Sequence, residues 1–278
     1  MKPTRMIGKI LRAIGPKIYA DVRWSLRSAM GNPMGQLFLL PLVVRKNDTV
    51  IDVGANIGEI TIELAELVGA NGAVHSFEPI QKNYEQLCAN VKNAGMKSRT
   101  MLYKIGLGDK NFTATFTVPK ERDTEATLIP HQDEAWKDFE KEKDKYIPEV
   151  CEVKTLATVL DGKLNGNISF MKCDVEGGEF LVFRGAEKLL GSKNPPVLMF
   201  EAYEKWTNDF GYHPRDMFKY LHEVGGYQIY WISPGGLKLV PPDSKIIPGI
   251  FYQWIDFIAV VPEVHHKRVD VMKFTASD

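Results

Sequence analysis

Hydrophobic and polar residues follow two different patterns along this chain. Short apolar runs, several of them rich in valine and isoleucine, predict buried strands, whereas apolar residues three and four positions apart predict helices with one buried face. The predicted strands cover residues 49–53, 73–77, 100–105, 112–118, 168–173, 195–201, 228–232 and 256–261. The predicted helices cover about 57–68, 81–94, 179–190 and 213–224. Because strands and helices alternate, the sequence predicts an α/β domain with a doubly wound, mostly parallel sheet.

A glycine-rich turn separates the first predicted strand from the first predicted helix. Its sequence is Asp52-Val-Gly54-Ala-Asn56-Ile-Gly58. A glycine at position 54 allows a ligand to approach the backbone closely, and a glycine at position 58 allows the helix to pack on the strand. A strand, a turn and a helix of this kind form a nucleotide-type pocket at the carboxyl end of a parallel sheet. We therefore predict that Asp52, Gly54, Asn56 and Gly58 bind a cofactor.

The charges near this turn favour a cationic cofactor over one that carries phosphate. A pyrophosphate at the helix N-terminus would lie close to Asp52 and be repelled, whereas the ammonium and sulfonium groups of S-adenosylmethionine would be attracted. Glu78 follows the second predicted strand, where a carboxylate suits the two ribose hydroxyls. Two alternatives remain open, namely an ordinary α/β turn with incidental acidic residues and an NAD site.

Acidic residues also follow other predicted strands. The third strand ends in Gly-Leu107-Gly-Asp109, where adenine would lie, so Leu107 and Asp109 are predicted to bind the cofactor. A plain turn into the next strand is the alternative there. Asp174 and Glu176 follow the strand at 168–173, and Glu201 ends the next one. Because the carboxyl ends of parallel strands meet at one edge of a sheet, we expect these acids to lie near the glycine-rich turn.

The composition is that of an ordinary soluble globular protein. The 278 residues are 44% hydrophobic and 25% charged, with a formal net charge of zero, which argues against nucleic acid as a partner. The three cysteines lack C-x-x-C spacing, so they predict neither a disulfide framework nor a zinc site and fit a reducing, cytoplasmic setting. No apolar run reaches the roughly eighteen residues needed to span a membrane.

Two segments differ from the rest of the chain. Residues 1–30 carry seven basic residues against one acid, a net charge of +6, together with an apolar stripe at helical spacing. This arm either packs on the domain as a leading helix or makes peripheral contact with a membrane surface. Residues 119–148 are dense in charge and are interpreted as an inserted substrate lid or recognition segment. The predicted division is an arm and lead-in over 1–46 and an α/β domain over 47–278.

Three segments together resemble a known family. They are Asp52-Val-Gly-Ala-Asn-Ile-Gly58, Phe77-Glu78-Pro79 and Met171-Lys-Cys-Asp-Val-Glu-Gly-Gly-Glu179, and they are similar to those of the FkbM-type methyltransferases, a class I S-adenosylmethionine-dependent family. The resemblance extends from about residue 50 to residue 200. It implies a seven-stranded, Rossmann-like class I methyltransferase fold with a reversed final strand. It also implies O-methylation of a hydroxyl on a sugar, a glycan or a small natural product.

Methyl transfer to a hydroxyl calls for a base or a metal ion, because a hydroxyl is a poor nucleophile until its proton is removed. We predict Asp174 and Glu176 as catalytic residues. Asp174 would orient the methionine end or bind a metal, and Glu176 would bind the acceptor or act as the base. Asp174 and Glu201 are the predicted ligands if Mg²⁺ takes part. His131 and His213 remain candidate bases. The alternative is that the acids cap helices and satisfy loop amides.

Two other functions remain open. An RNA 2′-O-methyltransferase would bring together a Lys-Asp-Lys-Glu set from Lys17 or Lys46, Asp174, Lys205 and Glu223. A non-catalytic binding module would keep the fold without turnover. The second is disfavoured because carboxylates gathered at one edge of a sheet repel each other and need a reason to be there.

Overall fold

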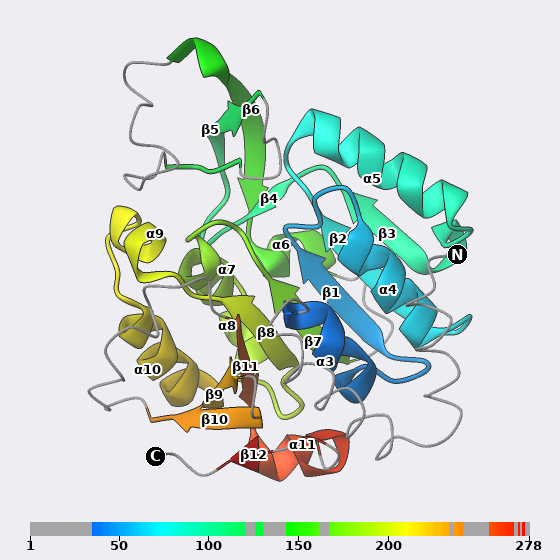
Figure 1. Cartoon of the computed structure of the whole chain (residues 1–278), viewed down its shortest axis with the longest axis vertical. Coiled ribbons are helices and arrows are strands. Elements are labelled where there is room, and N and C mark those ends of the chain that lie inside the picture. The colour runs from blue at the N-terminus through cyan, green and yellow to red at the C-terminus, as the bar shows by residue number, and fades with distance from the viewer. Residues whose placement is uncertain are drawn as a thin grey trace.

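A mostly parallel sheet runs through the part of the chain that the computed structural model describes, which comprises residues 35–120, 126–129, 143–161, 167–233, 236–241, 256–269, 272 and 274–275. Its nine strands lie in the order β12-β10-β9-β11-β8-β7-β1-β2-β3 (Figure 1). They are β1 (Thr49–Val53), β2 (Ala73–Phe77), β3 (Thr100–Tyr103), β7 (Ile168–Cys173), β8 (Val197–Glu201), β9 (Gln228–Ser233), β10 (Gly236–Val240), β11 (Asp256–Val260) and β12 (Phe274–Thr275).

The directions of these strands confirm the predicted fold class. β3, β2, β1, β7 and β8 are parallel to one another, and β11 is antiparallel to both β8 and β9. The predicted count of seven strands is wrong, because β10 and β12 extend the sheet beyond β9. β10 pairs with β9 in antiparallel register, with Gly236 opposite Ser233. A short connection suffices for such an antiparallel pair.

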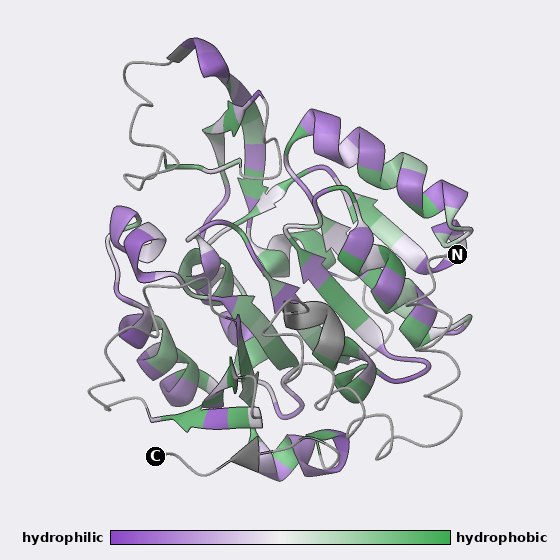
Figure 2. Ribbon diagram, viewed as in Figure 1, coloured by the Kyte–Doolittle hydropathy of each residue, from purple (hydrophilic) through white to green (hydrophobic). Residues whose placement is uncertain are grey.

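Helices cover both faces of the sheet. Successive residues of a strand point to opposite faces, so Val50 packs in one core while Ile51 and Val53 pack in the other. The helices on the Val50 side are α3 (Gly35–Val43), α4 (Glu59–Val68) and α11 (Pro262–Val269), and those on the Ile51 side are α6 (Leu156–Leu160), α7 (Glu179–Gly185), α8 (Glu187–Leu190) and α10 (Pro214–Gly225). Figure 2 shows apolar central strands and helices with polar outer faces. Each fully buried aliphatic or phenylalanine side chain contributes roughly 1.5–3 kcal/mol relative to an exposed one.

A second, smaller sheet stands beside the main one. It has the order β4-β6-β5, with β4 (Gly106–Leu107), β5 (Phe112–Pro119) and β6 (Tyr146–Lys154), and its hairpin projects at the top of Figure 1. Val118 and Cys151 pack against Ile80, which attaches the hairpin to the domain. The predicted strand at 112–118 is therefore correct, but it belongs to this second sheet. β6 escaped prediction because Pro148 and two exposed or half-exposed acids interrupt its apolar pattern.

Two predicted helices end or begin differently in the structure. α4 begins at Glu59 rather than at 57, because Gly58 lies in the left-handed region with φ 91°. The predicted helix at 179–190 is divided into α7 and α8. The end of α7 lies so close to the second sheet that a Cβ on Gly185 would be 2.0 Å from the carbonyl oxygen of Gly108. α5 (Gln81–Asn93) agrees with prediction, and α9 (Glu204–Asp209) was not predicted.

Parts of the predicted arm and of the predicted lid lie outside the described residues. This holds for residues 1–34 and for 121–125 and 130–142 within the segment 119–148. The division of the chain at residue 46 stays a prediction. Among the helices that the structure describes, none combines the length and the apolar character needed to cross a bilayer.

The turn after β1 touches the end of β7. Gly54 has φ 73°, and a Cβ on it would lie 1.8 Å from the carbonyl oxygen of Asp174. The backbone that follows β7 is therefore sufficient to require glycine here, and the close approach of a ligand to Gly54 stays a prediction. Gly58 likewise packs on α5 rather than on a strand, since its Cβ would lie 2.6 Å from Leu87 Cδ1.

Gly54→Ala should destabilise the protein far more than a matched change at Gly95. Gly95 has φ 71° but open space around its Cβ position, so Gly95→Ala carries backbone strain alone, about 1–2 kcal/mol. Gly54→Ala adds a backbone clash, for a total of about 3 kcal/mol or more. Urea unfolding of both variants measures this difference, and equal losses would contradict the contact between the Gly54 turn and β7.

Candidate active site

A cavity of about 330 Å³ lies at the carboxyl ends of β1, β2 and β7. Its wall consists mainly of residues 53–57, 77–80, 105–108 and 174–176, together with Lys172. The predicted site residues in the wall are Gly54, Asn56, Glu78, Leu107, Asp174 and Glu176. The predicted site residues outside the wall are Asp52, Gly58, Asp109 and Glu201. The structure therefore brings carboxylates from the ends of β2 and β7 to one cavity.

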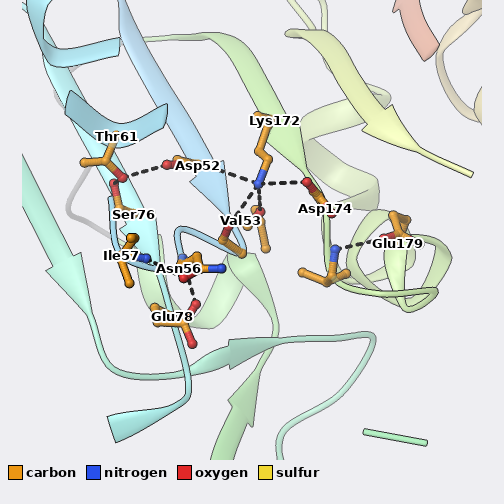
Figure 3. Close-up of polar contacts among 12 residues, drawn as sticks. Asp52, Val53, Asn56, Ile57, Thr61, Ser76, Glu78, Lys172, Asp174 and Glu179 are labelled. Carbon is orange, nitrogen blue, oxygen red and sulfur yellow. Dashed lines mark hydrogen bonds and ion pairs between the residues drawn. The ribbon is translucent and has the colours of Figure 1, made fainter. Parts of the chain in front are cut away.

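Glu78 holds the glycine-rich turn in place from the end of β2. Its Oε2 accepts a hydrogen bond from Asn56 N at 2.8 Å (Figure 3). Its Oε1 accepts one from Ile80 N at 3.0 Å. Asn56 itself lies in the left-handed region with φ 49°, which asparagine tolerates better than most residues. Burial raises the pKa of Glu78 to about 7, although both amide hydrogen bonds oppose the shift. Glu78 can still accept from a ligand hydroxyl, since each carboxylate oxygen has two lone pairs.

Lys172 joins the two strand ends, and the sequence reasoning missed it. Its side chain is buried, and Nζ donates to the carbonyl oxygens of Gly54 at 2.9 Å and Val53 at 3.3 Å. Nζ also lies 3.5 Å from Asp174 Oδ2 and 3.8 Å from Asp52 Oδ1 (Figure 3). Burial alone would lower the pKa of Lys172, but the two carboxylates outweigh it and raise the pKa above its ordinary value. Lys172 is therefore a buried cation between two acids.

Asp52 does not face the cavity, which corrects its predicted role. It is fully buried, and its Oδ2 accepts a hydrogen bond from Thr61 Oγ1 of α4 at 2.6 Å. The cause is strand alternation, because Asp52 points to the same face as Val50, toward α4. Lys172 lies 3.8 Å from Asp52 and partly compensates its charge within the fold, so the repulsion of a phosphate by Asp52 stays a prediction.

The loop after β7 holds Glu176 in a strained conformation at the cavity wall. Glu176 has φ 57° and is followed by Gly177 with φ 94°. Glu179 Oε1 accepts hydrogen bonds from Val175 N at 2.8 Å and Gly177 N at 3.4 Å, and Tyr212 Oη donates to Gly177 O at 2.6 Å. A glutamate in the left-handed region costs about 1–2 kcal/mol, and such strain persists only where neighbouring groups enforce it.

Glu201 lies at the end of β8, outside the cavity wall, with Asp256 opposite it on β11. Burial, followed by the charges of Asp174 and Glu176, raises the pKa of Glu201 well above its ordinary value. Within the described residues, no three or more His, Cys, Asp or Glu side chains gather closely enough to hold a metal ion. The structure thus gives no support to the predicted Mg²⁺ site at Asp174 and Glu201.

Other candidate residues lie away from the cavity. Asp109 pairs with Arg184 at 3.3 Å and so turns away from the position predicted for it. His213 caps α10 by accepting from Arg215 N, and its Nε2 lies 3.4 Å from Glu204. His131 lies outside the described residues.

The Lys-Asp-Lys-Glu set of an RNA methyltransferase is not assembled among the described residues. Lys46, Lys205 and Glu223 are exposed and absent from the cavity wall. Glu223 pairs instead with Lys219, one turn away on α10, at 3.8 Å. Lys17 lies outside the described residues.

The cavity wall suits a ligand that carries hydroxyl and cationic groups. Glu78, Asp174 and Glu176 offer carboxylate acceptors for hydroxyl and ammonium donors. Among the described wall residues, Lys172 is the one lysine or arginine, and carbonyls and carboxylates of the protein already engage it. The wall therefore fits S-adenosylmethionine, and it offers a diphosphate no basic side chain that is not already paired.

Comparison with known proteins identifies one family model. Residues 52–229 match the model described as the methyltransferase FkbM domain. No curated protein sequence matches the chain.

Among solved structures, an FkbM methyltransferase from Methylobacillus flagellatus is 16% identical with a TM-score of 0.46, over 87% of this chain and 59% of that chain. An S-adenosylmethionine-dependent O-methyltransferase from Thermotoga maritima is 13% identical with a TM-score of 0.40, over 85% and 63%. A Streptococcus mutans protein solved in complex with S-adenosylhomocysteine is 10% identical with a TM-score of 0.45, over 80% and 93%.

Substitutions at Glu176 should reveal the strain in its loop. At an ordinary position alanine is more stabilising than glycine, because glycine gains more freedom in the unfolded chain. At φ 57° the order should reverse, with Glu176→Gly more stable than Glu176→Ala by about 0.5–1 kcal/mol. Denaturant unfolding of the pair measures the difference, and a more stable alanine variant would contradict the left-handed conformation.

Proposed function

The chain belongs to the FkbM methyltransferase family, and we propose that it transfers a methyl group from S-adenosylmethionine to a hydroxyl of a sugar, a glycan or a small natural product. The observation that carries this proposal is one cavity whose wall includes the acidic residues Glu78, Asp174 and Glu176 and whose lysine, Lys172, is already paired. The family membership agrees with the resemblance in the sequence. The donor, the hydroxyl acceptor and the residue roles below are part of the proposal.

The wall residues divide into groups that suit different parts of the donor. Glu78 would accept hydrogen bonds from the ribose hydroxyls, and the apolar residues Ile80 and Leu107 would pack against the adenine ring. Asp174 would accept from the ammonium group at the methionine end. This ammonium contact is charge-assisted, so it contributes more than a hydrogen bond between neutral groups.

Glu176 is the proposed base. Bound S-adenosylmethionine supplies a methyl carbon already activated by its sulfonium, so the protein has to position the acceptor and remove its proton. The carboxylate of Glu176 accepts the hydroxyl proton as the oxygen forms its bond to the methyl carbon and the carbon–sulfur bond breaks. The fixed loop conformation keeps this carboxylate at the wall and limits the reorganisation needed during the reaction.

Donor affinity should depend on pH through Glu78. Its pKa is about 7 without ligand, so the carboxylate form, which accepts hydroxyl hydrogen bonds more strongly, grows as the pH rises through that value. We expect the affinity for S-adenosylmethionine to increase between about pH 6 and pH 8. Glu78→Gln should lose this part of the pH dependence and bind about tenfold more weakly at the upper pH.

Isothermal titration with S-adenosylhomocysteine as well as the donor provides the measurement for Glu78. Both ligands carry the ribose, so the affinities of both should show the same pH dependence and the same loss in the Gln variant. An unchanged affinity of the Gln variant at both pH values would remove Glu78 from the donor site.

Methyl transfer should require Asp174 and Glu176. A screen with tritiated-methyl donor against glycans, lipids and small polyols, with Mg²⁺ and with EDTA, should find a methylated hydroxyl. Glu176→Gln should lower turnover by about a hundredfold to ten-thousandfold while the donor still binds, since the base is lost. Asp174→Asn should weaken donor binding as well. Glu223→Gln, on the exposed face of α10, is the matched control. Full activity in both site variants would overturn the proposed roles.

A further inference from the structure

The charges around Lys172 distinguish two ligands that differ by a single charge. S-adenosylmethionine carries a sulfonium, whereas its demethylated product is neutral at sulfur and otherwise the same. A fixed charge near the cavity therefore changes the ratio of the two affinities, because it interacts with the sulfonium that only one ligand carries. Its effect on contacts that both ligands make cancels in this ratio. Lys172 is such a charge, because it belongs to the cavity wall and its side chain is 4% exposed.

The hydrogen bonds of Lys172 fix the position of this charge. Nζ is held between the Gly54 and Val53 carbonyl oxygens and two carboxylates, so it cannot swing away when a ligand enters. Asp52 is buried behind it and does not reach the cavity. Lys172 thus cancels the charge of Asp52, and Asp174 remains as the net negative charge of the three groups.

We propose that Lys172 is a specificity-determining residue for the cofactor: its buried positive charge sets how strongly the site prefers the cationic methyl donor over the neutral product. This inference rests on the proposed function, since it takes S-adenosylmethionine to be the donor. It goes beyond that function because it assigns donor–product selectivity to a side chain that the fold places behind the glycine-rich turn. A site with a weaker preference is inhibited more strongly by its own product, so Lys172 also sets the sensitivity of turnover to accumulated product.

The size of the effect follows from Coulomb's law. If the sulfonium binds roughly 10 Å from this unit charge, an effective dielectric constant of about 20 gives a change on the order of tenfold in the ratio of the two affinities. The sign is fixed by the charges alone. Loss of Lys172 adds net negative charge and favours the donor, whereas loss of Asp52 adds net positive charge and favours the product.

A series of three variants tests the inference by isothermal titration with S-adenosylmethionine and with S-adenosylhomocysteine, without any acceptor. The measured quantity is the dissociation constant of the product divided by that of the donor. Relative to wild type, Lys172→Met should raise this ratio about tenfold and Asp52→Asn should lower it about tenfold. The double variant Asp52→Asn/Lys172→Met restores the charge balance and should return the ratio to near the wild-type value. Lys219→Met, which removes one charge of an exposed pair on α10, should leave the ratio unchanged.

A ratio that stays within about twofold across the series would overturn the inference. If Lys172→Met does not fold, because Asp52 and Asp174 lose the cation between them, wild type against Asp52→Asn still decides the sign. A wild-type protein that binds neither ligand would instead contradict the proposed function, so the two failures are distinguishable.

Discussion

The buried ammonium of Lys172 is the interaction on which the rest of the site depends. β1 and β7 are parallel neighbours whose backbones pair as far as Val53 and Cys173, and the side chain of Lys172 adds contacts to the segments that follow. Lys172 rises from β7, donates to two carbonyl oxygens at the end of β1, and lies between Asp52 and Asp174. Burial of a single charge costs several kcal/mol; Lys172 offsets this cost for buried Asp52, and Asp52 and Asp174 offset it for Lys172. The same contact leaves Asp174 at the cavity with its carboxylate directed by a fixed partner.

The two loops that line the cavity, after β1 and after β7, share the same structural features. Each follows a parallel strand and contains one residue other than glycine in the left-handed region, Asn56 after β1 and Glu176 after β7. In each, a buried glutamate accepts hydrogen bonds from loop amides, Glu78 in the first and Glu179 in the second. Both glutamates therefore hold loop backbone in place, and for Glu78 a role in donor binding is proposed in addition. The alternative to catalysis, that acids cap helices and satisfy loop amides, was raised for Asp174, Glu176 and Glu201, whereas the structure shows such contacts for Glu78 and Glu179.

The sequence predicted the strands at the centre of the sheet well and the side-chain contacts poorly. β1, β2 and β7 have the predicted bounds, because a buried parallel strand is a short apolar run that local pattern reveals. The side chain of Asp52 was wrongly predicted to face the cofactor. The alternation of side chains along β1 could have corrected this, because Asp52 shares a face of the sheet with buried Val50. The role of Lys172 could not be predicted from its neighbours in the sequence. A lysine inside an apolar strand is stabilised by its hydrogen-bond partners, and these lie more than a hundred residues away in the chain. The left-handed conformation of Glu176 likewise arises from tertiary contacts such as that of Tyr212 with Gly177.

In the proposed complex, one cavity with acidic residues from the ends of β2 and β7 holds a cationic methyl donor against the glycine-rich turn. A crystal structure of the full chain with S-adenosylhomocysteine tests it most directly. We expect the ribose hydroxyls within hydrogen-bond distance of Glu78, the ammonium group beside Asp174, and Lys172 still bonded to the carbonyl of Gly54. A ligand seated elsewhere, or one whose ribose points away from Glu78, would contradict it.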